Sequence, residues 1–382
     1  MMANELKSTK SKKKVVQETQ DLWKTYSKKR ETWATHAQED KEFRLGKQWT
    51  SDQKRVLEER GQAAVVVNRI HPAVEAAKAL ITANKPQFRV SPREDSDNQV
   101  AQAMNGLLEY VWQISEGNSV MRRVVDDYYV TGIGAALVYI DPMMDMGKGE
   151  VCIHDVDPLD IYIDPNSRHP LADDAENIII SRLYTKEQAQ SLYPMYKKAI
   201  KNAASENFLT DRPVTNREDN GETTWPESTE TMTIANFGDN DEYVRGYERY
   251  YPLMIDYYRV FEKPTGFEDL LDEKEFIEYL EQPAWIIDGN VILEAEQAQA
   301  MIQQIEQVYQ QQLAQGREQG NLELPQKPEI EQITFEQLVE AGQIEVVSVP
   351  TKRIKQCVIV GDKLLYSRIL PIDKYPIVFF MN

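Results

Sequence analysis

The sequence has few cysteines, little basic charge and no long apolar run. Its 382 residues include two cysteines, Cys152 and Cys357. Two are too few for a disulfide framework or a thiolate zinc site, and they indicate a reducing compartment. We interpret both as small apolar side chains of strands. No stretch approaches the about 18 apolar residues of a membrane span, and no apolar segment follows the N-terminal lysines. We therefore expect a soluble, unprocessed chain without a membrane partner.

Basic charge is scarce overall but concentrated near the N-terminus. The chain has 44 Lys and Arg against 62 Asp and Glu, a net charge of -18. This balance argues against a nonspecific binder of DNA or of anionic membranes. Residues 1–30 carry nine basic and three acidic side chains, or +6, which leaves -24 for the rest. Lys12, Lys13 and Lys14 are therefore candidates for nucleic-acid or capsid contact, although such a run is usually a solvated face.

The common catalytic signatures are missing. The sequence contains no GxxxxGK[ST], HExxH, CxxC or GxSxG pattern, so it has no signature of a P-loop ATPase, zinc protease or serine hydrolase. Gly132 and Gly134 match two glycines of the dinucleotide fingerprint, but Leu137 occupies the third position and a helix precedes them. We predict a helix-to-strand turn there. The four histidines are dispersed, and we expect no enzyme activity, no metal and no cofactor.

An aspartate-rich block is the strongest candidate for chemistry. The stretch DVDPLDIYIDP contains four aspartates: Asp155, Asp157, Asp160 and Asp164. It does not fit a calcium loop, because Asp160 stands where glycine is required and no glutamate closes the frame. On an extended strand, Asp160 and Asp164 would lie about 13 Å apart, too far to share one cation. We predict that all four are structural: Asp155 and Asp157 in a turn before the strand, and Asp164 in the next turn.

Hydrophobic spacing alternates between helical and strand periods, which predicts an α+β fold. The expected helices are 15–37, 51–61 with a cap at Thr50 or Ser51, 71–86, 98–130 with a break at Gly117, and 185–194 capped by Thr185. The expected strands are 133–141, 150–156, 159–165, 177–184, 243–264 and several within 344–382.

These elements group into six regions along the chain. They are a basic N-terminal tail and helix (1–40), a helical region (41–135), a β-rich region with a short helix (136–205), an acidic mobile loop (206–242), a strand layer (243–264 with 344–382) and an inserted helical hairpin (265–343). The loop has ten acidic and two basic residues. The hairpin helix has an apolar stripe from Ala298 to Leu313, which suits either a structural hairpin or a partner-binding coiled coil.

Four segments in order carry a resemblance to a known family. They are FRLGKQWTSDQKRVLEERGQAAVVVNRIHPAVEAA, ANKPQFRVSPRED, VVDDYYVTGIGAALVYID and IHDVDPLDIYIDPNSRHPLADDAENIIISRLYTKEQAQSLYP. Together they cover residues 40 to 197, with weaker likeness in the later strands. This order resembles the portal proteins of tailed bacteriophages, in particular the P22-like family of short-tailed phages.

The resemblance implies a structural role in the virion. It implies a ring of a dozen subunits at the unique capsid vertex, through which double-stranded DNA is packaged and ejected. The implied partners are the major capsid protein, scaffolding protein, terminase and tail adaptor proteins, met in the host cytoplasm during assembly. The matching segments correspond to a portal wing, in which helices pack on a β-rich layer. The stem and clip are not recognisable before the sequence stops at PIVFFMN, so we expect either a fragment, a split gene product or a portal that departs from the pattern.

Two other functions stay open at this point. One is a different virion structural protein, such as a head-completion adaptor or a scaffold-interacting protein. The other is a metal-dependent nuclease or peptidase built on the aspartate-rich strands.

The acidic composition is compatible with a conduit for DNA, because each phosphate that the protein neutralised would add affinity for the passing DNA.

Overall fold

The computed structural model describes residues 9–84, 86–93, 97–205, 243–287, 290–293, 295–318 and 330–381. The chain forms two compact units, Met1–Leu253 with Arg353–Asn382, and Met254–Lys352. Helices and several sheets confirm the predicted α+β class. The predicted acidic loop, 206–242, lies outside the described residues. The predicted boundaries after residues 40, 135 and 205 stay predictions.

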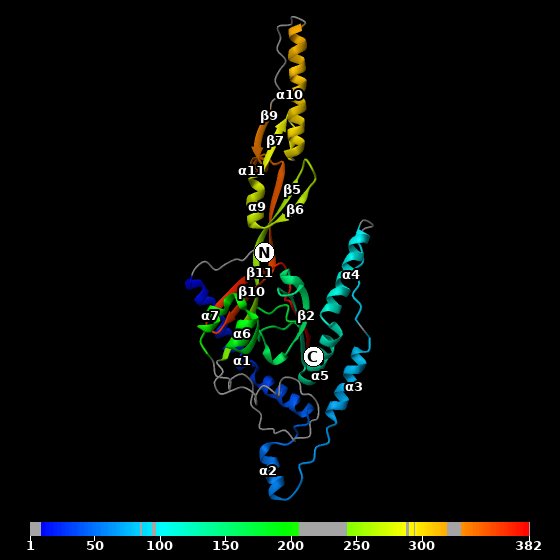
Figure 1. The fold of residues 1–382 in the computed structure, drawn as a ribbon, viewed down its shortest axis with the longest axis vertical. Coiled ribbons are helices and arrows are strands. Elements are labelled where there is room, and N and C mark those ends of the chain that lie inside the picture. Colours follow the sequence, from blue (N-terminus) through cyan, green and yellow to red (C-terminus); the bar gives the residue numbers. More distant parts are fainter. Residues whose placement is uncertain are drawn as a thin grey trace. The chain divides into compact units, whose positions relative to one another are not determined.

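Most of the described helices of the first unit lie close to the predicted positions, while the first is longer at both ends and the last was not predicted; Figure 1 shows their arrangement. They are α1 (Thr9–Arg44), α2 (Ser51–Glu59), α3 (Ile70–Thr82), α4 (Asn98–Ile114), α5 (Gly117–Thr131), α6 (Lys186–Leu192) and α7 (Lys197–Lys201). Capping boxes start α2 at Thr50 and α6 at Thr185, as expected. The predicted break at Gly117 is also confirmed. Helix α1 runs beyond 15–37 because its flanks are rich in Lys, Glu and Gln, which favour helix without adding an apolar stripe.

Two antiparallel sheets organise the first unit, and the strands β5, β6 and β10 of the larger one lie partly or wholly in the second unit. The smaller has the order β12-β1-β2, and the larger has the order β11-β10-β5-β4-β3 with β6 beside β5. The strands of the smaller sheet are β1 (Ile133–Asp141), β2 (Glu150–Val156) and β12 (Ile377–Met381). Those of the larger sheet are β3 (Ile161–Ile163), β4 (Ile178–Thr185), β5 (Tyr243–Glu262), β6 (Glu268–Leu271), β10 (Ile344–Val360) and β11 (Lys363–Leu370). The chain passes between the two units within β5 and β10.

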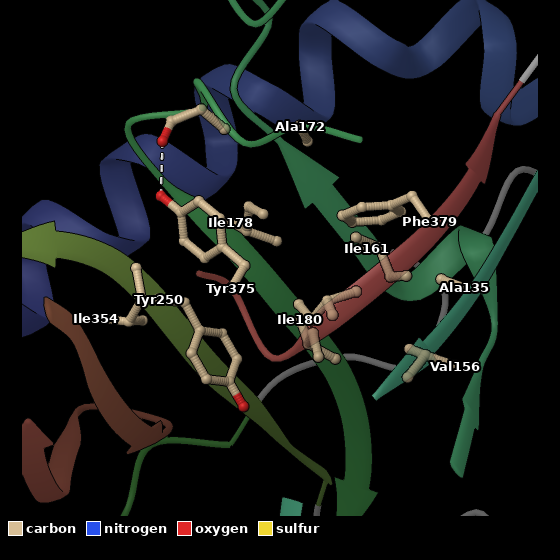
Figure 2. Packing of buried hydrophobic residues seen from close by; sticks show 12 residues of the cluster. Ala135, Val156, Ile161, Ala172, Ile178, Ile180, Tyr250, Ile354, Tyr375 and Phe379 are labelled. Atoms are coloured by element: carbon tan, nitrogen blue, oxygen red, sulfur yellow. Dashed lines mark hydrogen bonds between the residues drawn. The ribbon is translucent and has the colours of Figure 1, made fainter. Parts of the chain in front are cut away.

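Both faces of the first half of β4 are buried, so its side chains contribute to two cores. Ile178 and Ile180 belong to a cluster that also includes residues of β1, β2 and β12 (Figure 2). Ile179, on the opposite face of the strand, packs with Trp23 and other residues of α1. The larger sheet therefore lies between α1 and the smaller sheet. This position explains the continuous apolar run in β4, since a strand buried on both sides shows no alternation.

The second unit has its own sheet and core. Its further elements are α9 (Glu273–Leu280), β7 (Pro283–Ile287), β8 (Asn290–Ile292), α10 (Ala295–Glu318), β9 (Ile330–Thr334) and α11 (Phe335–Glu340). The sheet has the order β8-β7-β9. Tyr279 of α9 and Phe335 of α11 meet edge to face in the core, with ring centroids 4.9 Å apart.

The predicted insertion, 265–343, falls within this second unit and contains the helices α9, α10 and α11. It also contains strands β6 to β9, so it is not a hairpin of helices alone. Each of these strands has at most five residues. Such short runs carry too little periodicity to distinguish a strand from a helix end in sequence.

Candidate functional site

The aspartate-rich block folds into a tight turn between two strands. After β2, Pro158–Asp160 form a 3-10 turn, and β3 follows directly. Asp157 caps this turn, because its Oδ1 accepts the backbone N–H of Leu159 at 2.9 Å. The same oxygen accepts a hydrogen bond from Lys41 Nζ at 2.9 Å. One carboxylate thus holds both the turn and the end of helix α1.

The other three aspartates have separate partners. Asp155 accepts from Arg123 Nε at 2.8 Å, and Asp160 accepts from Arg182 Nε at 2.8 Å. Asp164 is buried, and its two oxygens accept the backbone N–H groups of Asn166 (2.9 Å) and Glu176 (3.2 Å). No group of His, Cys, Asp and Glu in the described part of the chain is arranged to hold a metal ion.

The structure corrects two of the predicted positions. Asp155 lies in β2, one residue before its end, and not in the turn. Asp160 lies in the 3-10 turn and not on a strand, because Pro158 begins the turn and delays β3 until Ile161. Asp157 and Asp164 lie in turns, as predicted.

Arg30 of α1 also binds the aspartate-rich block, through its backbone carbonyl groups. Its guanidinium donates hydrogen bonds to the carbonyl oxygens of Pro158, Leu159 and Ile161. It also lies over the ring of Tyr162, 3.9 Å from the centroid. A guanidinium suits this place because its fork of N–H donors reaches several carbonyls at once. The sequence did not indicate this residue, since more than a hundred positions separate it from its partners.

A second charged cluster joins α1, α3 and α5. Arg44 Nη2 lies 2.6 Å from Asp126 and 3.0 Å from Glu75, while Lys78 Nζ lies 3.1 Å from Asp126. Burial tends to raise the pKa of Glu75, but the hydrogen bond and charge of Lys78 and the charge of Arg44 outweigh it and lower that pKa. A cavity of about 450 Å³ beside them is lined by cations and carboxylates in similar number. Because the cations and carboxylates largely neutralise one another, we interpret the cluster as a structural contact between α1, α3 and α5.

The two glycines of the predicted turn have different roles. Gly132 ends α5 with a φ of 80°, a conformation that glycine adopts without strain. Gly134 lies in β1, where a Cβ atom would stand 2.3 Å from the carbonyl oxygen of Val124. The helix-to-strand connection therefore uses one glycine for its turn and the other for close packing of α5 on β1.

The remaining candidates lie apart from the block. Lys12, Lys13 and Lys14 lie in the first turns of α1 with exposed side chains, and none has an ion pair with a described residue. Both cysteines are buried, Cys152 in β2 and Cys357 in β10, so the prediction of small strand side chains is confirmed. Among the described helices, none has the length and apolar character needed to cross a membrane.

Comparison with known proteins agrees with the resemblance seen in the sequence. The model of the phage P22-like portal protein family matches residues 20–382. No curated protein matches the chain. The family match includes the aspartate-rich block, both sheets of the first unit and the whole second unit. The family has a structural role in phage virions and in DNA packaging. The chain therefore belongs to the phage P22-like portal protein family.

Proposed function

We propose that this chain is the repeating subunit of a portal ring of twelve copies at one capsid vertex. Double-stranded DNA would enter and leave the head through the ring. Terminase would dock on it during packaging, tail adaptor proteins after packaging, and scaffolding and major capsid proteins during head assembly. The family match over residues 20–382 carries this proposal.

The net negative charge of the chain supports a role as a conduit for DNA. A net charge of -18 opposes lasting attachment to DNA, because affinity for the backbone comes mainly from neutralised phosphates. A passage that must let DNA slide in both directions benefits from weak contact. The same charge would hinder a protein that must hold DNA in place.

The contacts of the aspartate-rich block favour a structural role over nuclease activity. Asp157 and Asp160 are engaged by Lys41 and Arg182, and both oxygens of Asp164 accept backbone N–H groups. A two-metal nuclease needs carboxylates that converge on shared ions. These carboxylates instead join the block to α1, to β4 and to the following loop.

The test is the assembly state of the purified full chain. Native mass spectrometry and negative-stain electron microscopy should show a ring with a central hole and twelve subunits. Monomers at every concentration tested, including in the presence of scaffolding and capsid proteins, would contradict the proposal. A chain that binds only to preformed portal rings would be an adaptor instead.

The enzymatic alternative is tested on the same sample. The chain should leave linear double-stranded DNA intact in the presence of Mg²⁺ or Ca²⁺. Metal-dependent cleavage that disappears in both Asp160→Ala and Asp164→Ala would establish a nuclease and would contradict a purely structural role.

A further inference from the structure

Helix α4 combines two properties that do not suit a helix in water. Its 17 residues, NQVAQAMNGLLEYVWQI, include one charged side chain, Glu109, although 28% of the chain is charged. Yet Ala101 is its one buried residue. Depletion of charge on an exposed surface is typical of the centre of a protein interface.

The exposed apolar residues of α4 form a stripe. Val100, Met104 and Leu107 are 61%, 48% and 54% exposed, and Val111 and Ile114 continue their spacing of four and three residues. This spacing places all five on one side of the helix, as in the contact seam between two packed helices. The stripe therefore has the pattern of a helix-packing surface.

The segment before α4 contacts another side of the helix. Asn105 binds the backbone of Val90, accepting from its N–H at 2.7 Å and donating to its carbonyl at 3.0 Å. Trp112 packs against Phe88, with ring centroids 5.4 Å apart. At 100° per residue, Asn105 and Trp112 lie roughly opposite Leu107. The contacts with the preceding segment thus leave Val100, Met104 and Leu107 exposed. The C-terminal end of α4 instead contacts β2, where Tyr110 donates to Glu150 at 2.7 Å and Ser115 accepts from the backbone N–H of Ile153 at 3.0 Å.

Helix α3 has an exposed face of small and apolar side chains. Its charged residues Glu75 and Lys78 are engaged in the ion pairs with Arg44 and Asp126. Its outer side presents Ala73, Ala76 and Leu80, all exposed, with Leu80 at 78%. Small alanines leave room for large side chains of a second helix, and no charged residue interrupts this face. Figure 1 shows α3 and α4 as two separate helices that follow one another in the chain.

The amount of open apolar surface is large for an isolated chain. From α2 to α4 the exposed large apolar residues are Val56, Val65, Val67, Ile70, Leu80, Ile81, Phe88, Val100, Met104, Leu107, Leu108 and Tyr110. Burying one such side chain removes roughly 60–120 Å² of apolar surface. Twelve of them, about half exposed, leave on the order of 500 Å² open. A standard interface has about 800 Å² per partner, a little over half of it apolar. Because these residues are divided between the two faces, each face contributes on the order of 250 Å², about half of the apolar part of a standard interface.

We propose that α4 of one subunit packs through Val100, Met104 and Leu107 on the outer face of α3 of a second copy of this chain. Because the two surfaces differ, the contact is heterologous, which is the kind of contact that a cyclic ring repeats from subunit to subunit. This inference rests on the proposed function, which supplies a neighbouring copy on each side.

The first test places a charge in the stripe. Leu107→Glu puts a carboxylate into the apolar contact, and we expect rings to be lost or reduced at least tenfold in native mass spectrometry. Gln102→Glu is the matched control, because Gln102 is exposed on the side of α4 away from the stripe. Rings should persist in this control. Circular dichroism melting of both variants separates a lost contact from a misfolded subunit.

The outcomes for the two proposals are distinct. If the unmodified chain forms no rings, the proposed function fails. If the unmodified chain forms rings and Leu107→Glu forms them equally well, the inference about α4 is overturned and the portal assignment stands.

The second test identifies the counterpart on α3. Chains with Leu80→Cys and chains with Leu107→Cys are mixed, assembled and oxidised, and the two natural cysteines do not interfere because both are buried. We expect a disulfide-linked dimer in the mixture and none in either variant alone. Rings without the mixed dimer, a dimer of Leu107→Cys with itself, or a link to scaffolding or capsid protein would each overturn the α3 assignment.

Discussion

The four aspartates of the block are similar in sequence but differ in what their loss would leave behind. Asp164 is buried and accepts two backbone N–H groups, so its removal leaves donors without partners. Asp155 pairs with Arg123, whose side chain is 51% exposed, so water replaces most of that interaction. The deeper burial of the Asp164 carboxylate decides the difference.

This difference gives a prediction at the level of single residues. Asp164→Ala should lower the free energy of unfolding by about 1–3 kcal/mol, measured by chemical denaturation. Asp155→Ala, the control in the same block, should lower it by less than about 1 kcal/mol. Equal effects in the two variants would show that burial does not determine the role of these carboxylates.

The loop after β3 contains a carboxylate with a strongly shifted pKa. The hydroxyl of Ser167 and the backbone N–H groups of Arg168 and His169 donate to Asp174 and lower its pKa to about 2. Because the folded pKa lies below the ordinary value of 3.8, this carboxylate stabilises the loop above pH 4, and the contribution is lost as pH falls towards 2.

Hydrogen exchange of the loop amides tests this pH dependence. In the unmodified chain, protection of the amides of Arg168 and His169 should decrease between pH 4 and pH 2. In Asp174→Asn it should already be low at pH 5 and change little. Asp173→Asn, which removes a neighbouring carboxylate, should behave like the unmodified chain. A pH-independent difference between the two asparagine variants would count against the titration of Asp174.

Among the elements, those with strong local signals were predictable. Thr50 and Thr185 begin α2 and α6 through capping boxes, which depend on residues three apart. The break at Gly117 was visible as a glycine, but its cause was not. A Cβ atom there would lie 2.2 Å from the indole ring of Trp112. Local sequence thus located the helix ends, while packing supplied the reason.

Elements and contacts that depend on distant residues were not predictable. Strands β7 and β9 acquire their identity from pairing with each other, although β8 and α10 lie between them in the chain. In the candidate site, the aspartates could be identified from sequence, but not their partners Lys41, Arg123 and Arg182. These partners come from three other elements, and side chains that meet only in the folded chain leave no spacing pattern.

The packing of α5 on β1 gives a prediction at the level of elements. Gly134→Ala should destabilise the chain by several kcal/mol or prevent folding, because its Cβ atom would meet the backbone oxygen of Val124. Gly132→Ala has open space around it and should cost only about 1–2 kcal/mol, for the left-handed conformation. Thermal melting and soluble yield measure both, and the reverse order would contradict the close approach of α5 to β1.

For the whole molecule, the uneven charge raises the question of where DNA contact would occur. The first 30 residues are net positive, while the chain carries -18 overall. Lys12, Lys13 and Lys14 are exposed and have no ion pair with a described residue. A ring would repeat this group in every subunit, so that weak single contacts add together. We propose that these lysines contact either DNA phosphates or the capsid.

Salt dependence distinguishes the two partners. If the lysines neutralise phosphates, log K for duplex DNA falls with log salt by about 0.9 per contact, so substituting all three with alanine should make the slope shallower by up to about 2.7 per subunit engaged. The control replaces Lys148, Lys197 and Lys198, which are also exposed, and should leave the slope unchanged. An unchanged slope in the Lys12–Lys14 variant, with fewer rings incorporated into assembling capsids, would assign these lysines to the capsid. Normal incorporation together with an unchanged slope would contradict both roles and leave the run as a solvated helix face.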